Sequence, residues 1–250
     1  MKKILIVLAM ALFFVSQASA DVINTGRPIT PFKDFVWDLQ DVFNSIRVAP
    51  TPSIDAVNGQ SNVAVWQSQA SGGSIATFIF TDIGDSGDIV GMYSYADNTK
   101  MLPIFPGDSL SGAQVMISFF ADGSVKNLMT SQTIAGFGNV FGFYFDNNGG
   151  IVDIAYTEDS LNGGIPLALT YQGTGTNRIQ IGALAPGYFV AEEWIIAFDG
   201  YPHGTGQYDY NDAVFLVESI ERASVPEPGI LILLGIGLGA VGLFSRRIKL

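Results

Sequence analysis

The chain has 250 residues, no cysteine and a formal net charge of −11. The lack of cysteine excludes disulfides, iron–sulfur clusters, thiolate zinc sites and cysteine nucleophiles. The acidic balance argues against a nucleic-acid partner, because binding to phosphates requires clustered Lys and Arg side chains.

The first twenty residues have the parts of a secretory signal peptide. Lys2 and Lys3 form a short positive region, and residues 4–15 are an unbroken apolar run. Small residues at 18–20 fit a signal peptidase pocket, so we expect cleavage after Ala20 and a mature chain that begins at Asp21. A membrane anchor is the alternative. However, about 12 apolar residues that each rise about 1.5 Å do not cross a hydrocarbon core of about 30 Å.

Between the two ends, residues 21–228 hold all 23 acidic residues and 7 of the 12 basic residues, so the body carries a charge of −16. Such a body suits divalent cations or high solubility. About 200 residues are enough for one sizeable core. We therefore expect one exported domain at residues 21–224.

One short helix is predicted near residues 35–43, where apolar residues recur at helical spacing between prolines. The remainder of the body has the short apolar or alternating runs that are typical of β-strands. These predicted strands cover residues 63–66, 75–80, 89–95, 114–120, 140–145, 151–156, 166–171, 178–181, 194–198 and 213–219.

Turn signals separate the predicted strands. The clearest is Asn147-Asn148-Gly149-Gly150, which joins residues 143–145 to residues 151–154 as a predicted hairpin. Many short strands at roughly regular spacing predict a single all-β domain with a sandwich or jelly-roll architecture.

Candidate metal ligands gather near the end of the body. Asp199, Asp209, Asn211 and Asp212 lie within 14 positions, just before a strongly apolar run. Carboxylate and amide oxygens are the ligands that calcium requires, and a divalent ion relieves the repulsion between crowded carboxylates. The alternative is a surface turn, in which Asp and Asn cap local backbone groups. Both interpretations are open from the residue types alone.

A second acidic cluster contains Asp82, Asp85 and Asp88, spaced three residues apart with two glycines between them. Three such carboxylates can also chelate a cation. A solvated turn is the preferred interpretation, because no other residue pattern supports a site there.

Enzyme signatures are thin. His203 is the only histidine, it stands in a turn-like setting, and the sequence contains no G-x-S-x-G nucleophile elbow. The acidic neighbours Glu192-Glu193 and Glu158-Asp159 are poor acid/base pairs, because adjacent residues of a strand point to opposite faces. We therefore expect no catalytic activity.

Three tryptophans bear on the competing hypothesis, which is an exopolysaccharide-binding lectin or a carbohydrate-active enzyme. Trp37, Trp66 and Trp194 are candidates for stacking on sugar rings. Burial in the core is the more usual fate of tryptophan in a β-sandwich. A groove lined by exposed Trp or Tyr, with two carboxylates about 5–10 Å apart, would favour a glycan hydrolase.

The C-terminal end has three parts in a fixed order. Val225-Pro226-Glu227-Pro228 stops any preceding strand or helix, and residues 229–244 then run without a charge before the basic residues Arg246, Arg247 and Lys249. The predicted apolar helix at 229–244 is long enough to enter a bilayer but shorter than the usual span of about 20 residues. The terminal cations would stay on the cytoplasmic side, which places the body outside.

This arrangement resembles the PEP-CTERM sorting signal, a tail at residues 225–250 that exosortase-type enzymes of Gram-negative bacteria handle. The resemblance implies recognition near Pro226, Glu227 and Pro228, removal of the tail, and delivery to the envelope or outside. Proteins with such tails are often linked to exopolysaccharide and biofilm matrix. An ordinary single-pass anchor is the alternative.

A second resemblance covers about residues 140–218. The segments 194–199 and 209–215 look like the ending of a domain of unknown function in exported bacterial proteins, which reads D-Y-N-D before an apolar strand. Members often read F-E-D where this chain has Phe198-Asp199-Gly200. The resemblance implies an extracellular β domain with a link to calcium and implies no reaction.

Together these features predict an exported envelope or matrix protein with a structural or adhesive role. Its expected partners are signal peptidase, an exosortase-like enzyme, exopolysaccharide, and the membrane through the tail before processing. Calcium is the expected cofactor.

Overall fold

The computed structural model describes residues 19–33, 37–69, 74–80, 87–106, 109–148, 154–200 and 208–226. The predicted apolar tail helix at 229–244 and residues 1–18 of the predicted signal peptide lie outside these ranges. The chain divides into two compact units, one of residues 23–223 and one formed by the two ends of the chain. Within the described residues, no helix combines the length and the apolar character that crossing a membrane requires.

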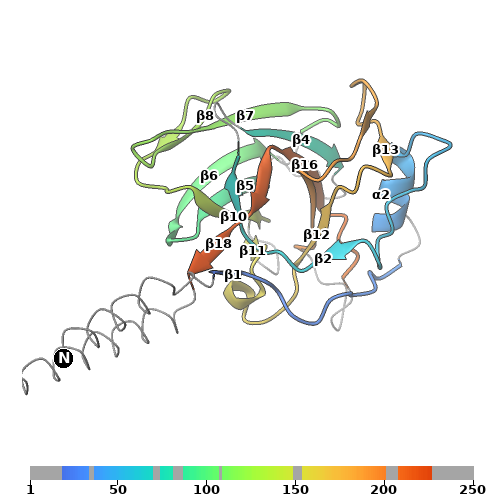
Figure 1. Ribbon diagram of the computed structural model, residues 1–250, viewed down its shortest axis with the longest axis horizontal. Coiled ribbons are helices and arrows are strands. Elements are labelled where there is room, and N and C mark those ends of the chain that lie inside the picture. The colour runs from blue at the N-terminus through green and yellow to red at the C-terminus, as the bar shows by residue number, and fades with distance from the viewer. Residues whose placement is uncertain are drawn as a thin grey trace, which may run out of the picture. The chain divides into compact units, whose positions relative to one another are not determined.

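The unit of residues 23–223 consists of antiparallel sheets, so the predicted all-β fold is confirmed (Figure 1). The first sheet has the order β17-β3-β10-β5-β6, with β11 also paired to β10. Its strands are β3 (Trp66–Ser68), β5 (Ile89–Ser94), β6 (Asp97–Pro106), β10 (Val140–Asp146), β11 (Ile154–Tyr156) and β17 (Ile220–Arg222).

The second sheet has the order β2-β12-β15-β16-β4-β7-β8-β9. A separate two-stranded sheet pairs β13 (Arg178–Ile179) with β14 (Gly187–Tyr188). The strands of the second sheet are β2 (Gln60–Ser61), β4 (Ser74–Phe80), β7 (Gln114–Phe119), β8 (Val125–Asn127), β9 (Thr133–Ile134), β12 (Ala168–Gln172), β15 (Glu193–Phe198) and β16 (Ala213–Glu218).

The β15–β16 hairpin is buried on both faces, which explains its two unbroken apolar runs. Trp194, Ile196 and Phe198 face the main core, together with residues of the first sheet. Ile195 and Ala197 alternate with them and face a second core. Since successive side chains of a strand point to opposite faces, one hairpin supports two hydrophobic layers.

The second core is closed by the helix α2 (Leu39–Ile46), which Figure 1 shows beside β12 and β13. The helix begins where it does because Asp38 and Asp41 form a reciprocal capping box at its N-terminus. Leu39, Val42, Phe43 and Ile46 then recur at helical spacing and are buried. The predicted short helix is therefore confirmed, but it starts four residues later than the pattern suggested.

Two of the three tryptophans lie in the main core. The rings of Trp66 and Trp194 are fully buried and meet edge to face, with centroids 5.5 Å apart. Their predicted burial is confirmed, and stacking on a sugar is excluded for both. Trp37 differs, because 42% of its surface is exposed.

Candidate functional site

The predicted metal ligands lie in the loop that joins β15 to β16. Phe198 pairs with Ala213 at the end of the ladder, so Asp199 and Asp212 are the first residues beyond the two strands. The hairpin therefore brings together residues that are 13 positions apart in the sequence. Asp199, Asp209, Asn211 and Asp212 are all buried, so this loop does not lie at the surface, although Asp199 and Asp212 accept hydrogen bonds from local backbone amides as the alternative predicts.

Asp199 is held by backbone groups of the same loop. Its Oδ2 atom accepts hydrogen bonds from the amides of Asp209 at 2.8 Å and Tyr210 at 3.4 Å. Its Oδ1 atom is buried and accepts no hydrogen bond within the described part of the chain. Burial, and then the negative charges of Asp212 and Asp209, raise the pKa of Asp199 to about 8.

Asn211 presents a second oxygen of the same kind. Its Nδ2 atom donates to the carbonyl oxygen of Trp37 at 2.5 Å, which fixes the orientation of the amide. The Oδ1 atom therefore points away from Trp37, and it is buried without a hydrogen bond among the described residues. Because a buried polar atom without a partner is costly, this oxygen needs a ligand or a solvent molecule.

Asp212 links the two ends of the β15–β16 loop through Gly200. Its Oδ2 atom accepts a hydrogen bond from the Gly200 amide at 2.6 Å, and the Gly200 carbonyl accepts one from Asn147 Nδ2 at 3.0 Å. Only glycine fits at position 200, since a Cβ atom there would lie 2.5 Å from the Phe145 ring. These contacts fix the carboxylate relative to the two neighbouring strands.

Tyr210 adopts a left-handed backbone conformation, with φ of 59°. This conformation is uncommon for an aromatic residue and is found where the surrounding structure imposes it. Here the Tyr210 hydroxyl donates to the carbonyl of Pro166 at 2.8 Å, and the Tyr210 amide faces Asp199. The turn therefore aims two backbone amides at one carboxylate oxygen.

The oxygen atoms of the loop are of the kind that calcium binds, but within the described residues they do not form a closed cage of carboxylates. Within the described residues, no group of three or more His, Asp or Glu side chains is arranged to hold one metal ion. The oxygens that need a partner are instead Oδ1 of Asp199 and Oδ1 of Asn211, one carboxylate and one amide. Calcium takes six to eight oxygen ligands of mixed type, so carbonyls and waters would complete such a site.

The second acidic cluster is only partly described. Asp82 and Asp85 lie outside the described residues, as does His203. Asp88 is 2% exposed, so the predicted solvated turn is wrong at this position. The reason is that Asp88 immediately precedes the buried strand β5 and is covered together with it.

The two predicted processing segments pair with each other. In the unit formed by the chain ends, β1 (Ser19–Asp21) runs antiparallel to β18 (Ser224–Pro226), and Ala20 lies opposite Val225. The predicted signal peptidase site is therefore adjacent to the start of the Pro-Glu-Pro segment. Glu227 and Pro228 lie outside the described residues.

Comparison with known proteins identifies one of these segments. Residues 224–248 match the family model described as the PEP-CTERM protein-sorting motif. No curated protein and no solved structure matches the chain. The chain thus carries a PEP-CTERM sorting motif, which marks it as an exported, envelope-directed protein that an exosortase-like enzyme processes. The resemblance of residues 140–218 to a D-Y-N-D-type domain stays a prediction.

Proposed function

We propose that this protein is a non-catalytic structural or adhesive component of the outer surface or extracellular matrix of a Gram-negative bacterium, and that calcium stabilises it. The observation that carries the proposal is the sorting motif at residues 224–248, which directs an all-β domain to the envelope. The buried oxygens of the β15–β16 loop support the calcium part. Signal peptidase and exopolysaccharide are the further partners proposed for this role.

The loop's own residues would act as a preformed but incomplete cation site. Asp199 and Asn211 would supply one oxygen each, and Asp209 and Asp212 would supply negative charge close by. When bound, calcium supplies a divalent positive charge that balances the buried carboxylates. Extracellular modules bind calcium with dissociation constants of about 10⁻⁴–10⁻³ M, a range that suits a protein stabilised only after export.

A proton competes with calcium for the Asp199 carboxylate. The pKa of Asp199 is raised to about 8, so at neutral pH and without calcium this carboxyl group is mostly protonated. A cation that binds Oδ1 must displace the proton. Calcium binding should therefore strengthen as the pH rises from about 6 to about 9.

Thermal unfolding with and without calcium tests the site. At 100 times its dissociation constant, calcium should stabilise the chain by about 2.7 kcal/mol, which is roughly 5–10 °C in Tm for a chain of this size. Asp209→Asn combined with Asp212→Asn should abolish the rise, and Asp122→Asn should preserve it, because Asp122 is an exposed turn residue. A melting curve that EDTA and calcium leave unchanged contradicts the calcium proposal.

Localisation tests the sorting part separately. Deletion of residues 225–250 should release a soluble protein that does not reach its normal place in the envelope. The pair Pro226→Ala and Glu227→Ala should have the same effect on sorting, and Ser245→Ala should have none. Normal placement of the deletion variant in fractionated cells contradicts the role proposed for the tail.

A second candidate function, exopolysaccharide binding, is supported by Trp37. Its exposed side chain lies over a shallow hollow of about 480 Å³ that is lined by Asp41, Asn44 and Ser45. An exposed aromatic ring beside polar side chains suits stacking on a sugar. Trp37→Ala should then weaken retention of the protein on matrix polysaccharide in affinity electrophoresis. Unchanged retention removes the support for this candidate.

A further inference from the structure

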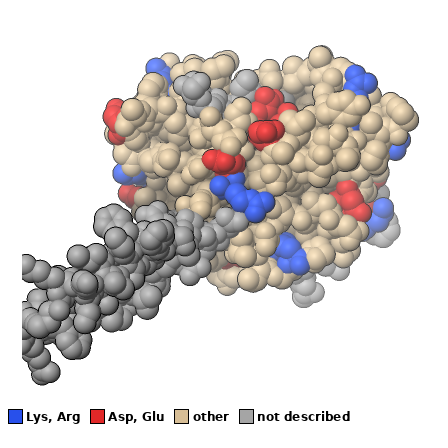
Figure 2. All heavy atoms as spheres, in the orientation of Figure 1, with Lys and Arg blue, Asp and Glu red and all other residues tan. Residues whose placement is uncertain are grey.

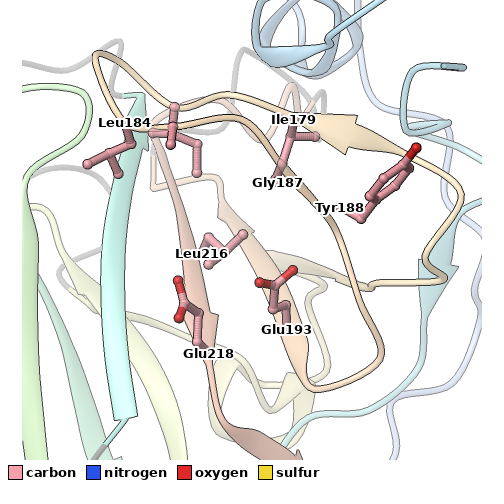
Figure 3. Close-up of a pocket in the computed structure, with 9 residues that line it drawn as sticks. Ile179, Leu184, Gly187, Tyr188, Glu193, Leu216 and Glu218 are labelled. Atoms are coloured by element: carbon pink, nitrogen blue, oxygen red, sulfur yellow. The ribbon is translucent and has the colours of Figure 1, made fainter. Parts of the chain in front are cut away.

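A pocket of about 110 Å³ lies between the β13–β14 ribbon and the β15–β16 hairpin (Figure 3). The pocket borders the second core, so part of its lining is apolar. Ile179, Ile181 and Leu216 are buried side chains of that core. Tyr188 stands at the side of the pocket with 55% of its surface exposed.

Two glutamates complete the lining. Glu193 and Glu218 are directly opposite each other in the β15–β16 ladder, and Figure 3 shows their carboxylates on the same side of the sheet. Like charges in this position destabilise a sheet, because opposing Cβ atoms are only about 5 Å apart. The pair therefore requires an explanation.

Within the described residues, no cationic side chain forms an ion pair with either glutamate. Glu193 accepts one hydrogen bond, from the Val190 amide at 2.8 Å. Glu218 forms no hydrogen bond and no ion pair within the described part of the chain. Both carboxylates are half-buried, and burial raises the pKa of each. The pocket thus offers two half-buried carboxylates that have no positive partner in the part of the chain that the structure describes.

The rest of the lining indicates an organic rather than an inorganic cation. A hydrated metal ion gains nothing from Ile179, Ile181 and Leu216, whereas a hydrocarbon stem packs against them. An exposed tyrosine ring attracts an ammonium group through its π face. The volume is somewhat below the roughly 150 Å³ of a cavity that holds benzene, which leaves room for about five non-hydrogen atoms.

We propose that this pocket binds a primary alkylammonium group, presented as the end of a lysine side chain on a partner protein. The four side-chain carbons and the nitrogen of lysine match the volume, the apolar lining and the paired carboxylates. The body's charge of −16 attracts a basic partner. The site is separate from the proposed calcium ligands and does not depend on them.

Ligand-observed NMR on the full-length chain in a non-ionic detergent tests the site. The probe is Nα-acetyl-lysine methylamide, with the uncharged norleucine analogue and glucosamine as comparisons. The lysine probe should show saturable transfer with a dissociation constant on the order of 1 mM, as expected for so small a ligand. The norleucine analogue should bind at least tenfold more weakly.

Single substitutions in the pocket then assign the contact. Glu218→Gln should weaken binding of the lysine probe at least tenfold, and Tyr188→Ser should weaken it several-fold. Glu192→Gln removes the same charge from an exposed neighbour and should change the affinity less than twofold. The thermal melting curve of each variant shows that the fold is retained.

Three results would each overturn the proposal. Equal binding of the norleucine analogue would show a purely apolar pocket. Tighter binding of glucosamine than of the lysine probe would assign the pocket to a sugar. Unchanged affinity in Glu218→Gln would show that the carboxylates take no part.

Discussion

Two buried acidic regions of this protein are built in opposite ways. After β11, Glu158 and Asp159 each have a partner from elsewhere in the chain. The Tyr93 hydroxyl donates to Glu158 at 2.6 Å, and the guanidinium of Arg27 donates to both oxygens of Asp159 at 3.0 and 3.1 Å. In the β15–β16 loop, by contrast, Asp199 lies beside Asp209 and Asp212, which repel its negative charge.

The two regions differ in the groups that residues 24–37 place beside them. Asn24 donates to the Thr157 carbonyl at 2.8 Å and accepts from the Asp159 amide at 3.0 Å, which positions the following Arg27. At the β15–β16 loop, the hydrogen bonds from this segment involve backbone groups: the Phe32 amide donates to the Tyr208 carbonyl, and the Trp37 carbonyl accepts from Asn211. The first region thus has its partners among the described residues, whereas we propose that the second is completed by a proton or an added cation.

The charges on the face drawn in Figure 2 give no sign of this contrast. On the face drawn in Figure 2, acidic and basic side chains of the described residues are scattered among uncharged ones. The two regions differ in the groups that lie beneath the surface, where charges are least screened. Substitutions of single buried groups are therefore the sharpest way to test the comparison.

The largest effect should come from Arg27→Ala. It removes the positive partner of Asp159 from the Glu158–Asp159 region, which we call the balanced region, in contrast to the unbalanced region around Asp199. It leaves the partly buried Asp159 without its cation and removes a donor to the Ala168 carbonyl. The free energy of unfolding should fall by about 2–4 kcal/mol, measured by urea denaturation at pH 7.

Lys33→Ala is the matched control for Arg27→Ala. The Lys33 side chain is 77% exposed in its ion pair with Asp38, so solvent screens the pair and the loss should be far smaller than that of Arg27→Ala. Equal losses in the two variants would mean that burial of the Arg27–Asp159 pair contributes nothing.

Asp199→Asn should raise the free energy of unfolding, because it removes the repulsion of Asp199 by Asp209 and Asp212. At pH 9 without calcium, Asp199 is ionised beside two other carboxylates, so its neutral replacement should stabilise the fold by about 1–3 kcal/mol. At pH 5 the carboxyl group is already protonated, and the gain should vanish. A gain that is equal at both pH values would contradict the raised pKa.

The unsubstituted chain should itself lose stability with rising pH when calcium is absent. The folded-state pKa of Asp199, about 8, exceeds the unfolded value of about 4, so the folded state binds the extra proton between these values. Stability from this group is complete below pH 4 and is lost as the pH rises toward 8, by at most about 1.4 kcal/mol per pH unit. Urea midpoints across this range measure the slope, and saturating calcium should flatten it.

Among the substitutions of buried groups, the smallest effect should come from Tyr93→Phe, which removes the hydrogen-bond donor to Glu158. Burial raises the pKa of Glu158, and the Tyr93 hydroxyl opposes this rise. The substitution should cost about 1–2 kcal/mol at pH 7 and less at pH 4, where Glu158 takes up a proton more readily. Tyr156→Phe is the control, since Tyr156 contacts Tyr93 through its ring. A loss for Tyr156→Phe equal to that for Tyr93→Phe would contradict the role of the hydroxyl group.

Much of the fold follows from local pattern. Strands β4, β5, β7, β10, β15 and β16 lie where apolar runs predict them. The predicted partners of the hairpin also pair, but Asp146 lies opposite Ile154, so the connection is longer than the predicted turn at 147–150, and residues 149–153 lie outside the described residues. The strand β6 is missed because its first residues are polar and it contains Pro103 and Pro106. It lies at the edge of the first sheet, where proline is tolerated.

The candidate sites are less accessible from sequence, because they depend on contacts between distant segments. Residue types alone identify Asp199, Asp209, Asn211 and Asp212, but not the Trp37 carbonyl that orients Asn211 from 174 positions away. The sequence also places Glu193 next to Glu192, although adjacent residues of a strand point to opposite faces. The carboxylate that lies across from Glu193 is that of Glu218, which follows from the register of β15 and β16. This register cannot be deduced from the sequence of either strand alone.

The most direct test of the unbalanced region is calorimetric titration of calcium into the metal-free chain at pH 7, in two buffers of different ionisation enthalpy. The prediction is one calcium ion bound per chain, with release of about one proton, since Asp199 titrates near pH 8. At pH 9 the proton release should largely disappear. The absence of calcium binding, or binding without proton release at pH 7, would contradict a cation site at Asp199.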